Sequence, residues 1–242
     1  MQGVVLAAGQ GQRLRPDTDD LPKTLLPVDG DDTILDIALR NLAAAGVTQT
    51  AIVVGYASEA ISARADALAV RYGMRLDLVY NDRVDWNNAY SLWHAREFYA
   101  NGALLVNGDT VHPASIQKTL LSDERDGIRL AVDSVKTLTD EAMKVTVDDS
   151  GAVVRITKLM PPETSFGEYI GVAHIGASIA DELTAALERT FKSDPNLYYE
   201  DAFQLLADSG PNLHAVSIGD VEWVEVDDHT DLALARELAC RC

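Results

Sequence analysis

A glycine-rich, cationic stretch near the N-terminus contains the first residues whose types and spacing suggest chemistry. In LAAGQGQRL, Gly9 and Gly11 precede Arg13, and Lys23 follows within a stretch interrupted by prolines. A glycine-rich turn lets backbone N–H groups approach phosphate oxygens without obstruction by side chains. The chain has a formal net charge of −18. A small anion such as a nucleoside triphosphate therefore needs this local positive charge, or a metal ion bound with it.

Two common phosphate-binding loops do not match this stretch. The dinucleotide fingerprint needs a third glycine at the start of a helix, whereas Leu14 and Pro16 stand here. The P-loop needs Gly-Lys-Ser/Thr, whereas Gly11 is followed by Gln12 and Arg13. Taken alone, the stretch also fits an ordinary turn between a strand and a helix, with an incidental arginine.

Two aspartates at the ends of predicted strands are candidate metal ligands. LLVNGD ends at Asp109, and VEWVEVDD contains Asp227, which shares one face of its strand with Glu225. The neighbouring Asp228 is explained as the N-cap of the last helix, whereas Asp227 has no such explanation. Aspartates from distant strands can hold one Mg²⁺ together with water and phosphate oxygens. The alternative for Asp109 is an ordinary Asn-Gly-Asp turn.

The first half of the chain alternates between strand-length apolar runs and amphipathic helical stretches. Strands are predicted over 4–8, 50–56, 75–82 and 104–109, and helices over 33–46, 58–73 and 91–100. This alternation implies a parallel, doubly wound sheet, with ligands at the carboxyl ends of its strands.

After residue 127 the pattern indicates strands joined by turns. Strands are predicted over 129–135, 142–159 (a hairpin at DDSG), 169–176 and 221–226, and helices over 180–191, 199–208 and 230–238. We therefore predict one domain, 1–242, of α/β class: a Rossmann-like doubly wound mixed sheet with a small antiparallel annex.

The composition excludes several classes of function. The acidic balance argues against nucleic acid or an anionic membrane as partner, because its field repels phosphate polymers. No apolar stretch is long enough to span a bilayer, and the N-terminus lacks a signal-peptide layout. Cys240 and Cys242 suggest neither a disulfide framework nor a zinc site, so a cytoplasmic location is expected.

The residues G-x-G-x-R-L-x-P, followed by P-K-T-L-L-P-V, resemble the signature of nucleotidyltransferases that make nucleotide-activated sugars and alcohol phosphates. The resemblance implies a GT-A-like nucleotide-diphospho-sugar transferase fold in which Arg13 grips the triphosphate and Lys23 neutralises the reacting phosphates. The residues it places against the nucleotide here are Leu6, Ala7, Ala8, Gly9, Gly11 and Arg13.

The same resemblance implies the metal and the reaction. Asp109 and Asp227 fall on the family's Mg²⁺ ligands, and an oxygen of the acceptor phosphate attacks the α-phosphorus of the nucleotide, releasing pyrophosphate. It also implies a nucleotide-binding part at about 1–127, an acceptor-binding part at about 128–220 and a closing strand and helix at 221–242.

The stretch YNDRVDWNNAYSL resembles the N-D-x…N-N-x-Y-S-L stretch of bacterial choline-phosphate cytidylyltransferases and their phosphonate- and polyol-phosphate-using relatives. This likeness implies that Asn87, Asn88 and Ser91 lie near the base, with Tyr90 close by on the acceptor side. The alternative is a helix N-terminus capped by Asn88, with Tyr90 in the core.

Two lysines on the predicted hairpin are candidates for the acceptor phosphate. Lys158 matches the family's second lysine, which holds that phosphate, and would act with Arg13 and Lys23 in catalysis. Lys144 lies on the paired strand. The alternative, an exposed hairpin lysine, is more plausible for Lys144 than for Lys158.

Acidic and aromatic residues would complete the acceptor pocket. Glu168 and Tyr169 fall where sugar-type relatives contact the acceptor. Glu200 and Asp201 are candidates to face a cationic or hydroxylated head group, or are only first-turn acids of a helix.

These residues favour a magnesium-dependent cytidylyltransferase that couples CTP to a small phosphorylated or phosphonylated alcohol. One alternative is a sugar- or cyclitol-phosphate nucleotidyltransferase that uses another NTP, and another is a nucleotide-binding regulator without turnover. The expected partners are the NTP and a small phosphate or phosphonate, without nucleic acid or membrane, and a homodimer is left open.

Overall fold

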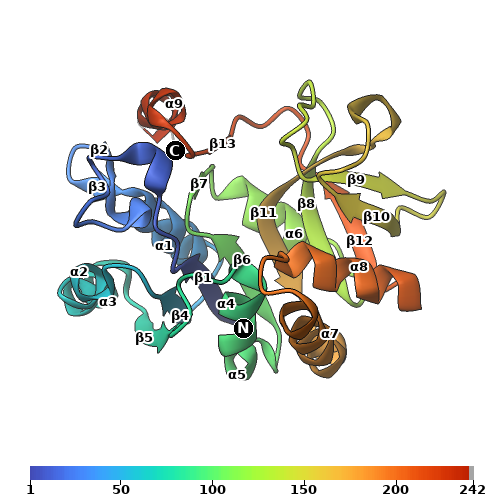
Figure 1. Ribbon diagram of the computed structural model, residues 1–242, viewed down its shortest axis with the longest axis horizontal. Coiled ribbons are helices and arrows are strands. Elements are labelled where there is room, and N and C mark those ends of the chain that lie inside the picture. Colours follow the sequence, from blue (N-terminus) through green and yellow to red (C-terminus); the bar gives the residue numbers. More distant parts are fainter. Residues whose placement is uncertain (240–242) are drawn as a thin grey trace.

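The computed structural model describes residues 1–239; Cys240 and Cys242 lie outside the described residues. A nine-stranded sheet runs through the molecule in the order β10-β9-β11-β6-β1-β4-β5, with β8 paired to β11 and β12 paired to β8 (Figure 1). Its strands are β1 (Gln2–Ala7), β4 (Gln49–Val54), β5 (Arg75–Tyr80), β6 (Ala103–Asn107), β8 (Ile128–Asp133), β9 (Lys144–Val147), β10 (Val153–Thr157), β11 (Gly167–Ile175) and β12 (Leu213–Ser217).

The strands β5, β4, β1 and β6 are parallel neighbours. Leu6 near the end of β1 is aligned with Asn107 at the end of β6, so the two carboxyl ends reach the same edge of the sheet. This arrangement confirms the predicted doubly wound mixed α/β fold, and it brings the residues after β1 and β6 together.

Helices cover both faces of the sheet, because successive side chains of a buried strand point in opposite directions. Val4 packs in a core with α4, α5, α7 and α8, whereas Val5 packs in a second core with α1, α2, α3 and α6. The helices are α1 (Ile34–Ala44), α2 (Ser58–Ser62), α3 (Ala65–Tyr72), α4 (Asn88–His94), α5 (Arg96–Tyr99), α6 (Ser115–Ser122), α7 (Ala180–Ser193), α8 (Tyr199–Ser209) and α9 (His229–Ala239).

The antiparallel strands predicted after residue 127 are present, and they extend the same sheet. β11 pairs antiparallel with β6, β8 and β9, and β9 forms a hairpin with β10. Because β11 runs antiparallel to β6, with Val172 aligned with Val106, the first residues of β11 lie next to the carboxyl end of the parallel strands.

Short strands tie the chain ends to the edge of the sheet. They are β2 (Pro27–Asp29), β3 (Asp32–Thr33), β7 (Thr110–Val111) and β13 (Val224–Glu225). α9 packs Leu232 and Ala235 against Leu14 and Val28 in a third core, so the C-terminal helix lies over the N-terminal loop (Figure 1). Within residues 1–239, no helix has both the length and the apolar character needed to cross a membrane.

The structure differs from the predicted elements in several places. The helix predicted over 91–100 is divided into α4 and α5, and the short strands β2, β3 and β7 were not predicted. The helix predicted over 58–73 is divided into α2 and α3, because Arg64 has φ −102° and ψ −11°, outside ideal helical geometry. The closing strand predicted over 221–226 is reduced to Val224–Glu225. Neither α6 nor β12 was predicted.

Candidate active site

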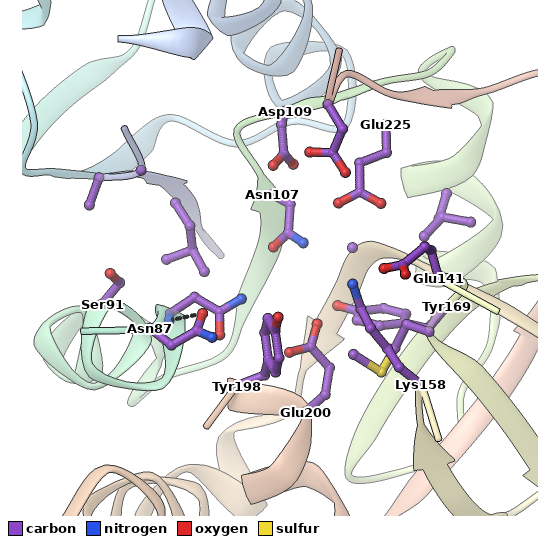
Figure 2. Close-up of a pocket in the computed structure, with 18 of the residues that line it drawn as sticks. Asn87, Ser91, Asn107, Asp109, Glu141, Lys158, Tyr169, Tyr198, Glu200 and Glu225 are labelled. Carbon is purple, nitrogen blue, oxygen red and sulfur yellow. Dashed lines mark hydrogen bonds between the residues drawn. The ribbon is translucent and has the colours of Figure 1, made fainter. Parts of the chain in front are cut away.

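A cavity of about 300 Å³ lies at the carboxyl ends of β1 and β6. Figure 2 shows Asp109 and Glu225 on one side of it, Ser91 and Asn87 on another, and Glu200 and Lys158 converging from the antiparallel part. The predicted site residues that line it are Leu6, Ala8, Gly9, Arg13, Asn87, Asn88, Ser91, Asp109, Lys158, Tyr169, Glu200 and Asp227. The predicted residues that do not line it are Ala7, Gly11, Lys23, Tyr90, Lys144, Glu168 and Asp201.

Backbone pairing explains how two aspartates distant in sequence meet. β7 directly follows Asp109 and pairs antiparallel with β13, which directly precedes Val226 and Asp227. The Val226 amide donates to the carbonyl oxygen of Asp109 at 2.9 Å, which extends this pairing. A Cβ on Gly108 would lie 2.4 Å from the carbonyl oxygen of Leu6, so only glycine lets the Asn-Gly-Asp turn pack against β1.

Asp109, Glu225 and Asp227 form an acidic cluster whose oxygen atoms lie within 4.8 Å of one another. The sequence placed Glu225 on the same strand face as Asp227, but we did not predict it as a ligand. Burial, followed by the charges of Asp109 and Asp227, raises the pKa of Glu225 to about 8. Asp109 Oδ1 is buried and has no hydrogen-bond partner within the described part of the chain. Oxygen donors at this spacing fit one hard divalent cation.

Two basic side chains balance the acidic cluster. Lys23 Nζ lies 2.9 Å from Asp109 Oδ2 and 3.1 Å from Asp227 Oδ1, and Arg13 Nη2 lies 2.8 Å from Asp227 Oδ2. Burial alone would lower the pKa of Lys23, but the two aspartates outweigh it and raise that pKa. Burial likewise would raise the pKa of Asp227, and the opposing charge of Lys23 and Arg13 lowers it. Lys23 thus contacts the acidic cluster but does not line the cavity.

Gly11 supports Lys23 instead of lining the cavity. Its φ of +59° lies in the left-handed region, and an added Cβ would lie 3.0 Å from Lys23 Cβ. Its carbonyl oxygen accepts a hydrogen bond from Thr18 Oγ1 at 2.8 Å, which holds the loop. Gly9 differs, because nothing would lie within 4 Å of a Cβ there. Gly9 therefore leaves room in the cavity. Ala7 faces the opposite core.

The asparagines predicted near the base are held by backbone groups. Asn87 Oδ1 accepts from the Asn88 amide at 2.8 Å, so Asn87, and not Asn88, caps α4. Asn88 Oδ1 accepts from the Tyr199 amide at 2.9 Å. Ser91 Oγ accepts from Asn81 Nδ2 at 2.9 Å. These bonds fix both side chains and leave the Asn88 amide N–H groups and the Ser91 hydroxyl proton as donors.

Tyr90 points away from the cavity, contrary to its predicted place on the acceptor side. Its hydroxyl donates to Asp82 Oδ1 at 3.1 Å, and its ring packs in an aromatic cluster with Trp93 and Phe191. The neighbouring Trp86 belongs to the same cluster and also lines the cavity.

Lys144 does not line the cavity, so its placement does not support the predicted acceptor-binding role. Its side chain is fully buried at the start of β9, and Nζ donates to the carbonyl oxygens of Thr139, Asp140 and Ala142. All three of its donors are therefore used to hold the preceding loop. Lys158, directly after β10, lines the cavity with Nζ 5.4 Å from the centre of the Tyr198 ring.

A buried polar network supports the floor of the cavity. The Tyr199 hydroxyl lies 3.0 Å from Asn107 Oδ1 and 3.1 Å from the Tyr169 hydroxyl. Gly171 has φ +77°, and a Cβ there would lie 2.5 Å from Asn107 Nδ2. Glycine at this position of β11 therefore gives the Asn107 side chain its space.

Two adjacent acids at the start of α8 have different roles. Asp201 Oδ2 accepts from the Tyr198 amide at 2.8 Å, so Asp201 closes the helix N-terminus and does not line the cavity. Glu200 lines the cavity, is only 5% exposed, and has no hydrogen-bond partner for Oε2 within residues 1–239. Burial raises the pKa of Glu200 to about 7.

Glu168 lines a second cavity of about 650 Å³. The two cavities share five lining residues, Arg13, Glu141, Lys158, Glu225 and Asp227, so they adjoin across the acidic cluster. Glu168 is nearly buried, and its Oε2 lies 3.7 Å from Lys136 Nζ. Burial raises the pKa of its carboxyl.

Comparisons of the sequence identify relatives. A family model described as Nucleotidyl transferase matches residues 2–157. The chain is 31% identical over 244 residues to the CMP-5'-(3-aminopropyl)phosphonate synthase of Streptomyces rubellomurinus, an alignment that covers 96% of this chain and 37% of the relative. It is 38% identical over 106 residues to the choline-phosphate cytidylyltransferase of Streptococcus pneumoniae, covering 43% of each. The chain thus aligns with less than half of the length of either relative.

Solved structures share the fold. The inositol-1-phosphate CTP transferase from T. maritima aligns with a TM-score of 0.85 at 24% identity, over 99% of this chain and 95% of that one. The CTP:phosphocholine cytidylyltransferase from Streptococcus pneumoniae aligns with a TM-score of 0.80 at 23% identity, over 98% of each. Because the matching family model also spans more than half of the sequence, this chain belongs to the nucleotidyl transferase family.

Proposed function

We propose that this chain is a magnesium-dependent cytidylyltransferase that couples CTP to a small phosphorylated or phosphonylated alcohol and releases pyrophosphate. The observation that carries the proposal is the acidic cluster of Asp109, Glu225 and Asp227, which lies within 4.8 Å and is neutralised by Lys23. The relatives named for cytidylyl transfer to choline phosphate and to an aminopropylphosphonate support the choice of base and acceptor class.

The acidic cluster would hold the metal. Asp109 Oδ1 is buried without a partner, and the pKa of Glu225 is raised to about 8 by burial and by its acidic neighbours, so the residues present suit a divalent cation. When bound, Mg²⁺ would supply positive charge to the triphosphate oxygens beside the carboxylates of Asp109 and Asp227.

The side chains then position and neutralise the reactants. Arg13, which lines the cavity, and Lys23, which lies against Asp109 and Asp227 at its wall, add positive charge that stabilises the negative charge developing on the departing pyrophosphate. Lys158, across the cavity, holds the acceptor phosphate so that one of its oxygens forms a bond to the α-phosphorus. The bond between the α-phosphorus and the pyrophosphate oxygen breaks in the same displacement. No covalent intermediate with the protein is needed, so catalysis depends on position and charge.

The donors beside α4 favour cytosine. Asn88 and Ser91 present N–H and O–H groups at the cavity after their acceptor atoms are occupied. Cytosine offers two adjacent acceptors, O2 and N3, on its pairing edge, whereas uracil carries a hydrogen on N3. Two donors from the protein therefore match cytosine and leave a donor facing the N3–H of uracil. In this proposal residues 1–127 bind the nucleotide, 128–220 bind the acceptor, and the segment from 221 supplies Glu225 and Asp227.

Pyrophosphate release tests the proposal directly. The protein is incubated with Mg²⁺, with each of CTP, UTP, GTP, dTTP and ATP, and with phosphocholine, an aminoalkylphosphonate, glycerol phosphate, inositol 1-phosphate or glucose 1-phosphate. We expect the highest kcat/KM with CTP and an acceptor of the first three kinds. A preference for another triphosphate with a sugar or cyclitol phosphate would replace this proposal with that alternative.

A variant distinguishes turnover at this site from the activity of a contaminating enzyme. Asp227→Asn removes the charge that joins Lys23, Arg13 and the acidic cluster, and we expect kcat to fall on the order of a hundredfold or more. Asp228→Asn is the matched control, since Asp228 Oδ1 accepts from the Thr230 and Asp231 amides outside the cavity. Equal loss in both variants would contradict a specific role for Asp227.

A further inference from the structure

Glu200 has a buried carboxyl group that the nucleotidyl transfer step does not use. It lies in the first turn of α8, is 5% exposed, and lines the cavity with Oε2 unpartnered within the described residues. Leaving a buried carboxylate oxygen without a hydrogen bond is unfavourable, because the desolvation of the oxygen is not compensated. A helix N-terminus alone does not require this arrangement, because the adjacent Asp201 already caps α8.

Glu200 and the basic Lys158 both line the cavity, and they form no salt bridge with each other. Figure 2 shows Glu200 and Lys158 converging on the cavity beside Tyr198 and Tyr169. No described carboxylate forms a salt bridge with Lys158, whose Nζ lies 5.4 Å from the Tyr198 ring centre. The acceptor side of the cavity therefore offers one cation and one buried carboxyl group, together with aromatic rings that favour a bound cation.

The adjoining cavity is also rich in acidic residues. It is lined by acids on three segments, including Asp133, Glu168 and Asp220. Although Arg13 and Lys158 are among the residues it shares with the first cavity, acids outnumber cations along its wall. Within it, Lys136 Nζ lies 4.3 Å from the centre of the Trp223 ring and 3.7 Å from Glu168 Oε2, so its charge is already shared. This negative surface repels an acceptor that carries only a phosphate, and repels less an acceptor that also carries a positive charge.

We infer that the acceptor is zwitterionic, with a phosphate or phosphonate held at Lys158 and an ammonium group whose counter-ion is the carboxylate of Glu200. This inference rests on the proposed cytidylyl transfer and adds the charge of the head group, which the proposed function leaves open between amine and polyol. Glu200 then acts as a specificity residue, and the raised pKa of its carboxyl returns toward its ordinary value when the ammonium binds.

Acceptors matched in shape and differing in charge test this inference. Phosphocholine is compared with 3,3-dimethylbutyl phosphate, in which carbon replaces the quaternary nitrogen, and aminoethyl phosphate is compared with propyl phosphate. With CTP and Mg²⁺, we expect the charged member of at least one pair to have a kcat/KM higher by on the order of a hundredfold. Equal use of charged and neutral members in both pairs would overturn the inference.

The variant Glu200→Gln assigns the preference to this residue. We expect it to lower the preference for the charged member over the neutral member by on the order of tenfold or more. Asp208→Asn is the control, because Asp208 is exposed at the other end of α8. A preference that persists in Glu200→Gln would overturn the assignment. Since the charge preference is first measured on the unaltered protein, a variant that fails to fold does not remove the test.

The result distinguishes this inference from the proposed function. Turnover of glycerol phosphate and the neutral alkyl phosphates without the charged acceptors would overturn the zwitterionic acceptor and leave cytidylyl transfer in place. Absence of pyrophosphate release from CTP with every acceptor would overturn the proposed function, and the inference with it.

Discussion

The two sides of the cavity differ in how far their polar groups are already paired. On the side of the parallel strands, residues 1–127, Lys23 bonds two carboxylates, and the oxygen atoms of Asn88 and Ser91 accept hydrogen bonds from the protein. On the side of the antiparallel strands, residues 128–220, Glu200 Oε2 has no partner among residues 1–239. On the first side most of these polar groups are paired before any ligand binds, with Asp109 Oδ1 left for a metal ion, whereas on the second side Glu200 is left for a ligand to pair.

This difference is consistent with separate roles for the two sides of the cavity. A triphosphate carries the same charges whichever acceptor it meets, so fixed cations and carboxylates suit it. An acceptor head group varies, and unpaired groups discriminate strongly because a mismatched ligand leaves them buried and unpaired. We therefore propose that the parallel part positions the nucleotide and the antiparallel part selects the acceptor, and the predictions below test that division.

The two lysines of the β9–β10 hairpin give the largest expected contrast. Lys158→Met removes the cation that faces the acceptor, so kcat/KM for the acceptor should fall on the order of a hundredfold with CTP affinity unchanged. Steady-state kinetics and a CTP titration measure the two quantities. A loss confined to CTP binding would contradict the assignment of Lys158 to the acceptor side.

Lys144→Met should show the opposite pattern. It removes donors from three buried carbonyl oxygens, so the free energy of unfolding should fall by about 2–3 kcal/mol while kcat/KM at permissive temperature stays within about threefold. Urea denaturation and the same kinetic assay report both. Unchanged stability together with a weakened acceptor would mean that the side chain reaches the cavity after all.

The loop glycines give a smaller effect on the parallel side. Gly11→Ala introduces a left-handed alanine and a Cβ 3.0 Å from Lys23 Cβ, so it should displace Lys23 and lower kcat/KM by about tenfold as well as costing ~1–2 kcal/mol. Gly73→Ala is the matched control: its φ is +62°, and nothing would lie within 4 Å of the new Cβ. Equal activity in the two variants would contradict the support that Gly11 gives to Lys23.

The nucleotide side was predictable because its signals are local. Gly9, Gly11, Arg13 and Lys23 lie close together in sequence, and a carboxylate such as Asp109 that follows a parallel strand must reach the ligand edge of the sheet. The structure places Gly9, Arg13 and Asp109 at the cavity, whereas Gly11 and Lys23 do not line it and Lys23 contacts Asp109.

The acceptor side was less predictable because its pairings are distant. Whether Lys144 or Lys158 faces the cavity depends on where β9 lies against β11 and on the path of the loop before it, neither of which periodicity reveals. Glu225 was placed on the correct strand face, but its contact with Asp109 depends on the β7–β13 pairing. Whether Glu200 or Asp201 lines the cavity likewise depends on how α8 packs.

Acidity should weaken both sides through one histidine in each, buried in the first and partly buried in the second, which is the smallest expected effect near neutral pH. Burial lowers the pKa of His112, in the parallel part, and of His174, on β11, to about 4. The unfolded chain takes up these protons first as the pH falls below about 6.5. Stability is therefore complete above that pH and declines toward pH 4, by at most about 1.4 kcal/mol per pH unit for each histidine.

Urea denaturation at pH 7, 6 and 5 measures this decline. His112→Gln should flatten part of the dependence, whereas substitution of the exposed His229 by glutamine should not. An unchanged slope in His112→Gln would contradict the assignment of the acid sensitivity to that buried ring.

The central claim is that the carboxylates of Asp109 and Asp227, joined by the β7–β13 pairing, share one divalent cation with the nucleotide. Its most direct test is the dissociation constant of CTP, measured by calorimetry with Mg²⁺ and again with EDTA, for the unaltered protein and for Asp109→Asn, Asp227→Asn and Asp228→Asn. We expect Mg²⁺ to tighten CTP binding by on the order of tenfold or more in the unaltered protein and in Asp228→Asn, and hardly at all in the other two variants. The same metal-dependent gain in all four proteins would contradict the claim.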